Sequence, residues 1–140
     1  MSYVLSDEMI SRVKTFCDGD EYFRNHADAF AAGDLEKLRS ITKAPRNEPV
    51  LMYNGGRFIA YTGMVVTSSG FYYRGTMELP KHTTWEEFLS SPINIYSVNG
   101  TPMCLRVKRG LIGYKPFAEI IGNPDECADF WIRVKHVIAG

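Results

Sequence analysis

GMVVTSSGFYYR, residues 63–74, is the stretch of sequence that decides the fold. Two runs rich in β-branched, apolar and aromatic residues flank Ser68-Ser69-Gly70, and such runs are typical of β-strands. Gly70 permits a tight turn between them, because glycine adopts positive φ at no steric cost. The stretch therefore predicts a β-hairpin with strands at 63–67 and 71–74.

Further turn signals on both sides extend this hairpin into a sheet. Asn54-Gly55-Gly56 and Asn99-Gly100 are strong signals for hairpin turns, because both tolerate positive φ. The additional predicted strands are 50–53, 57–62, 93–98 and 103–107. Lys81–Thr84 is interpreted as a polar connector. Consecutive hairpins favour an antiparallel sheet.

Helical signals occupy the chain before Pro45. Ser6 can cap a first helix, a second stretch at about 21–32 has apolar residues on one side, and Asp34 can cap a third, short helix.

The C-terminal segment carries the clearest helix signal. Asn123 is a good N-cap residue, Pro124 stands at the first helical position, and acidic residues fill the first turn. An apolar stripe follows, comprising Cys127, Phe130, Trp131, Val134, Val137 and Ile138. We expect a helix from about 124 to 138 that packs on the sheet.

Together these patterns predict a single α+β domain over residues 1–140. Residues 1–44 form its helical N-terminal part, and residues 45–140 form an antiparallel sheet with a C-terminal helix. We expect the sheet to be strongly bent or to close as a small barrel that the last helix caps. A length of 140 residues is ordinary for one domain.

Composition excludes several functional classes. Sixteen basic residues balance sixteen acidic ones, so the chain has no bulk attraction to nucleic acid or to anionic membranes. The N-terminus lacks signal-peptide character and no long apolar run is present, which predicts a cytoplasmic protein without a membrane span. The three cysteines and three histidines are scattered, so we expect no disulfide, metal or cofactor.

Aromatic residues beside basic ones provide the candidate binding residues, and no catalytic residue is predicted. The candidates are Tyr72, Tyr73, Arg74, Arg106, Lys108 and Arg109. Tyr72 must face away from Phe71 and Tyr73, because side chains alternate along a strand. We therefore expect one face to be covered by the N-terminal helices or by another protein. A second copy in a homodimer is the simplest such protein.

The quoted hairpin, together with its flanking segments 44–51 and 84–88, resembles small bacterial domains of the pleckstrin-homology-like family. In that family a strand ends in Thr-x-x-Gly-aromatic, a basic residue follows, and a Trp-x-x-Phe-like segment comes next. The resemblance covers about residues 44–139. It implies a barrel closed by the helix at 127–138, and a non-catalytic binding or protein-interaction module.

Two alternatives remain open. Residues 26–38 are similar to the helical opening of the nuclear-transport-factor-2-like cone fold, which implies small-ligand binding or isomerase chemistry. That chemistry needs an ionisable pair inside an apolar cavity, for which His26, Asp28 and Glu78 are the candidates. A stand-alone inhibitor or immunity protein is the other alternative. An apolar pocket of several hundred Å³ with a polar group inside would be the most informative observation.

Overall fold

The computed structural model describes residues 3–55, 62–111 and 113–140, and it confirms the α+β class, with helices at both ends of the chain. The helices are α1 (Asp7–Gly19), α2 (Glu21–Asn25), α3 (Leu35–Thr42), α4 (Trp85–Ser90) and α5 (Pro124–Ala139), with a 3-10 turn η1 (Ala27–Phe30). The strands are β1 (Ala31–Ala32), β2 (Val50–Gly55), β3 (Gly63–Thr67), β4 (Gly70–Arg74), β5 (Lys81–Thr84), β6 (Ile93–Val98), β7 (Thr101–Arg109) and β8 (Gly113–Glu119).

The described strands form two sheets and do not close into a barrel. One sheet has the order β1-β2-β3-β4-β5, and the other has the order β6-β7-β8. The β1–β2 pair is parallel, whereas the other pairs are antiparallel. The last strand of the first sheet, β5, ends at Thr84. This residue caps α4 with a complete capping box, and the chain continues as that helix. The barrel implied by the resemblance is therefore not the arrangement of these strands.

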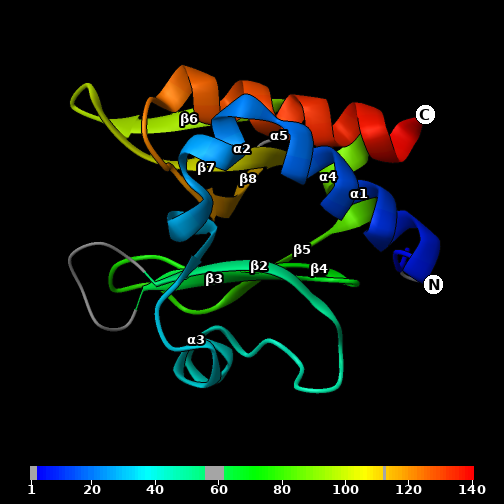
Figure 1. The fold of residues 1–140 in the computed structure, drawn as a ribbon. Helices are drawn as coiled ribbons and strands as arrows, with labels where there is room; N and C mark the ends of the chain where they lie inside the picture. The colour runs from blue at the N-terminus through cyan, green and yellow to red at the C-terminus, as the bar shows by residue number, and fades with distance from the viewer. Residues whose placement is uncertain (1–2, 56–61, 112) are drawn as a thin grey trace.

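The helices cover both outer sides of the molecule. Helices α1, α2 and α5 gather on one side, and α3 lies on the far side of the five-stranded sheet (Figure 1). Phe71 and Tyr73 face the main core, whereas Tyr72 packs with Leu38 and Val65 in a second cluster. The N-terminal helix α3 therefore covers the Tyr72 face, which is one of the two expected coverings.

The C-terminal helix forms as its sequence predicts. The Asn123 side chain accepts a hydrogen bond from the backbone N–H of Glu126 at 3.1 Å, and Pro124 opens the helix. Phe130, Trp131 and Val134 are completely buried. Trp131 packs against several aromatic rings, including Phe71, Phe88 and Phe117. This helix is therefore part of the main core.

The predicted helix at 21–32 is too long. The helix stops at Asn25, because the Tyr22 carbonyl, which would accept the His26 backbone N–H in a continued helix, is used by the His26 ring. The ring nitrogen Nδ1 donates to this carbonyl at 2.8 Å. The His26 backbone N–H turns instead to the Phe23 carbonyl. The chain continues as η1 and then as β1, which pairs with β2.

Two other local predictions need correction. Lys81–Thr84 is not a connector but strand β5, because Thr83 pairs with Phe71 of β4. Asn54 and Gly55 belong to strand β2, where they pair with β3. The predicted return strand at 57–62 falls almost wholly outside the described residues, and Thr62 is not in a strand.

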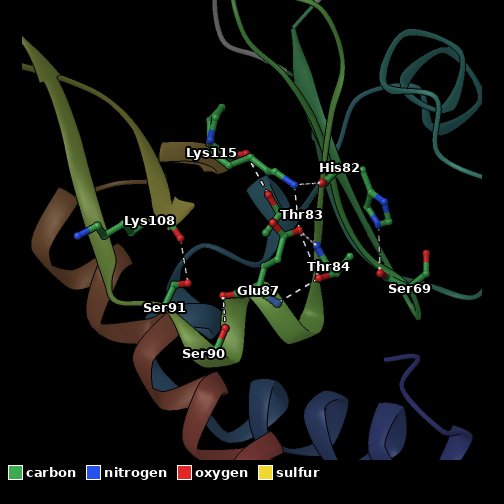
Figure 2. A network of polar contacts seen from close by, with 10 residues as sticks. Ser69, His82, Thr83, Thr84, Glu87, Ser90, Ser91, Lys108 and Lys115 are labelled. Carbon is green, nitrogen blue, oxygen red and sulfur yellow. Dashed lines mark hydrogen bonds and ion pairs between the residues drawn. The ribbon is translucent and has the colours of Figure 1, made fainter. Parts of the chain in front are cut away.

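A polar network joins the two sheets where β5 lies beside β8 (Figure 2). The Lys115 ammonium on β8 donates to the Glu87 carboxylate at 2.9 Å and to the His82 carbonyl at 2.7 Å. Burial alone would raise the pKa of Glu87, but hydrogen bonds from Lys115 and Thr84 and the Lys115 charge outweigh it and lower the pKa. All of these donors and acceptors belong to the protein itself, so the network holds the two sheets together at this junction.

Candidate functional site

A pocket of about 520 Å³ lies between the β4–β5 connection and the β6–β7 hairpin. The residues that decide its chemistry are Tyr73, Glu78, Tyr96, Met103, Cys104 and Glu119. They come from five separate segments, namely the end of β4, the following loop, β6, β7 and the end of β8. The pocket therefore exists only because the two sheets lie against each other.

The interior of the pocket combines a phenol with a thiol. Tyr73 and Cys104 are both buried, and each shifts the pKa of the other. Burial raises the pKa of the Tyr73 phenol far above its usual value, and the charges of Glu119 and Glu78 contribute in the same direction. Burial and the same two carboxylates raise the pKa of the Cys104 thiol to about 11, although Tyr73 and Arg106 act against them. Both groups are therefore neutral at pH 7.

Exposed apolar side chains surround the pocket. Tyr96 and Met103 line it and are 36% and 48% exposed. In the β4–β5 connection beside it, Met77 is fully exposed and Leu79 is 76% exposed. Met77 also has a positive φ of 56°, which is uncommon for a residue with a side chain. Exposed apolar side chains that gather at one site are typical of binding surfaces.

This arrangement is suited to binding rather than to nucleophilic chemistry. A cysteine nucleophile needs its thiolate, and the surroundings of Cys104 disfavour that form. The carboxylates of Glu78 and Glu119 place negative charge at the same pocket. Negative charge that disfavours a thiolate favours a bound cation, by the same Coulomb interaction.

The six predicted binding residues do not form one surface. Tyr72 and Tyr73 are both buried, on opposite faces of the sheet. Arg74 is half-buried, and its guanidinium donates to the carbonyls of Glu78 and Ile41.

The other three predicted residues lie on β7. Arg106 contacts the rings of Tyr96 and Tyr114, while Lys108 and Arg109 are exposed. Of the six, only Tyr73 lines the pocket. Arg106 acts electrostatically on Cys104 within it.

Sequence reasoning did not find Cys104 and Glu119 as site residues. The alternating pattern of β7 correctly indicated that Cys104 is buried, but burial alone predicts an ordinary core thiol. No local signal marks either residue, because the pocket depends on the contact between the β6–β7 hairpin and the β4–β5 connection.

The three ionisable residues proposed for a cone-type site do not meet. Asp28 is exposed on η1, His26 lines a separate polar pocket beside α2 and α5, and Glu78 lines the pocket described above. The structure therefore offers no support for these residues as a catalytic pair.

Within residues 3–55, 62–111 and 113–140, no cluster of three or more His, Cys, Asp or Glu side chains is arranged to hold a metal ion. All three cysteines are free and buried. In that same part of the chain, no helix has the length and apolar character needed to cross a bilayer. Comparison with protein-family models, with curated proteins and with solved structures finds no match to this chain.

Proposed function

We propose that this protein is a non-catalytic binding module, and that the pocket between the β4–β5 connection and the β6–β7 hairpin is its binding site. The occupant is a positively charged group on an apolar stem, such as a lysine or arginine side chain of a partner protein. The observation that carries the proposal is the exposed Glu78 carboxylate at a pocket whose rim is apolar.

The shape and size of the pocket support this class of ligand. Its volume of about 520 Å³ lies within the range of pockets that hold small ligands or side chains. The pocket is partly open to solvent, which suits the insertion of a side chain from a neighbouring molecule. Exposed Met103 and Tyr96 offer apolar contact to the stem of such a side chain.

The proposal agrees with what the resemblance to pleckstrin-homology-like domains implies, since such domains mostly bind other molecules. It does not depend on that resemblance. The pocket, its charge and its apolar rim are sufficient support.

A pair of matched small probes tests the proposal. Phenethylammonium and phenylacetate have similar size and an aromatic ring but opposite charge. In ¹H–¹⁵N NMR titrations of the full chain, we expect the cation to shift the amides of Thr76, Met103 and Cys104 with an affinity on the order of millimolar. We expect the anion to leave these amides unchanged.

Two variants distinguish the pocket from general surface charge. Glu78→Gln removes a pocket carboxylate, and it should weaken binding of the cation severalfold. Glu86→Gln makes the same change at an exposed position on α4 and should have no effect. Equal binding of the two probes, or equal weakening in both variants, would refute the proposal.

A further inference from the structure

A second arrangement lies on the three-stranded sheet, where an arginine is held between two tyrosines. The Cζ atom of Arg106 lies 4.3 Å from the centre of the Tyr96 ring and 4.0 Å from that of the Tyr114 ring. Arg106 is on the central strand β7, and the tyrosines are on the strands at either side, β6 and β8. A guanidinium stacked on aromatic faces gains a cation–π interaction at each one.

The guanidinium is also fixed at one edge. Its Nε donates to the side-chain oxygen of Asn94 at 3.1 Å, and Asn94 is the cross-strand partner of Arg106. Within the described part of the chain, neither Nη group takes part in a hydrogen bond or an ion pair. The two stacked faces and the Nε bond therefore hold the group in one orientation, with the Nη end available.

From this geometry we propose that Tyr96, Arg106 and Tyr114 form a recognition site for a carboxylate on an acidic segment of a partner protein. The available end of a guanidinium can donate two parallel hydrogen bonds to a carboxylate. Because Arg106 is already held in place, binding would cost little side-chain entropy. Tyrosine and arginine are also the residue types that most often anchor protein interfaces.

The charge around Arg106 favours an acidic partner. Lys108 follows two residues later on the same strand, so its exposed side chain shares a face of the sheet with Arg106. Lys108 is the cross-strand partner of Tyr114, so its positive charge lies beside the site. The site thus attracts anions, whereas the pocket that Tyr96 also lines carries carboxylates. Tyr96 takes part in both, and the two sites are separate in their chemistry.

A protein carboxylate suits the site better than a nucleic acid does. Binding along a phosphate backbone relies on an extended basic surface, and this chain has no excess of basic residues. One fixed guanidinium with Lys108 on the same face of the sheet is enough for a single acidic side chain.

Three probes test the inference on the full chain by NMR. The first is a capped peptide of alternating aspartate and glutamate, the second is the corresponding asparagine–glutamine peptide, and the third is a short oligodeoxythymidine. We expect only the acidic peptide to shift the Arg106 Nε–H signal and the amides of Tyr96 and Tyr114. Equal binding of the neutral peptide, stronger binding of the oligonucleotide, or no binding of the acidic peptide would overturn the inference.

Matched variants locate the binding. Arg106→Lys keeps the charge but loses the planar guanidinium with its parallel N–H donors, and we expect it to weaken binding about fivefold or more. Arg106→Gln should abolish it, whereas Arg12→Gln, the same charge change on an exposed part of α1, should leave it unchanged. Glu78→Gln should also leave it unchanged, which separates this inference from the function proposed above. Equal weakening in Arg106→Lys and Arg12→Gln would overturn the inference. Thermal melts establish that each variant is folded.

Discussion

Asp20 and Arg133, 113 residues apart in the sequence, are joined by two hydrogen bonds of 2.8 and 3.1 Å. Asp20 also caps α2 by accepting the backbone N–H of Phe23 at 3.1 Å. One buried carboxylate therefore ties the α1–α2 corner to the middle of α5, and its charge is paired rather than isolated.

Replacing Arg133 by alanine should lower the free energy of unfolding by about 1–2 kcal/mol, because the buried Asp20 carboxylate loses its charged donor. Arg133→Lys should recover part of the loss, since it retains the charge without the two-pronged geometry. Urea denaturation measures both effects. Arg12→Ala on the exposed surface of α1 serves as the control and should change stability by less than about 0.5 kcal/mol. A similar loss in the control would show that the Asp20 pair makes no special contribution.

The Glu87–Lys115 ion pair at the junction of the two sheets should make stability depend on acid pH. The pKa of Glu87 is lowered in the folded protein, so the unfolded chain binds a proton more readily than the folded one. This contribution to stability is present above the ordinary glutamate pKa and is lost as the pH falls through the lower, folded value.

Denaturation between about pH 6 and pH 3 tests this expectation. Glu87→Gln should reduce the acid-induced loss of stability by less than about 1 kcal/mol, because the pair is partly exposed to solvent. Glu86→Gln, its exposed neighbour on α4, should follow the wild-type curve. Coincident curves for wild type and Glu87→Gln would contradict the role of the pair.

Cys104 should react slowly with alkylating reagents although it lines a pocket that is partly open to solvent. With a thiol pKa of about 11, its thiolate fraction at pH 8 is about two orders of magnitude below that of an unperturbed cysteine. Mass spectrometry of iodoacetamide labelling gives the rate for each cysteine. We expect the rate at Cys104 to rise with pH up to about 11, and Glu78→Gln to increase the rate at pH 8. Labelling as fast as in the urea-unfolded chain would contradict this account.

Local signals in the sequence predicted the elements that depend on local chemistry. Asn123 and Pro124 define the start of α5, and Gly70 defines the turn between β3 and β4, because caps and turns need particular residue types whatever surrounds them. Strand β1 could not be predicted in this way. It forms because it pairs with β2, and the amide of Asn54 donates to the Ala29 carbonyl at 2.6 Å beside it.

The candidate site shows the same limit. The sequence singled out Tyr73 and Arg106 because aromatic and basic residues mark binding surfaces, yet it gave no means to place them relative to Cys104 or Glu119. Their arrangement follows from the packing of one sheet on the other. Tyr72 illustrates the reverse case, because alternation predicted its direction but could not identify α3 as its covering.

Among the glycines that the structure describes, Gly70 is the position where a single methyl group should do the most damage. Its φ is +137°, and an added Cβ would lie 2.2 Å from the Thr83 carbonyl oxygen. That oxygen belongs to the neighbouring strand β5, so the clash would push β5 away from β4 and disturb the junction with β8. We expect Gly70→Ala to cost about 2–4 kcal/mol in urea denaturation. Gly19→Ala, at the end of α1 with nothing within 4 Å of the added atom, should change stability by less than about 1 kcal/mol. Equal stability of the two variants would mean that the β4–β5 pairing tolerates the displacement, contrary to the close contact with Thr83.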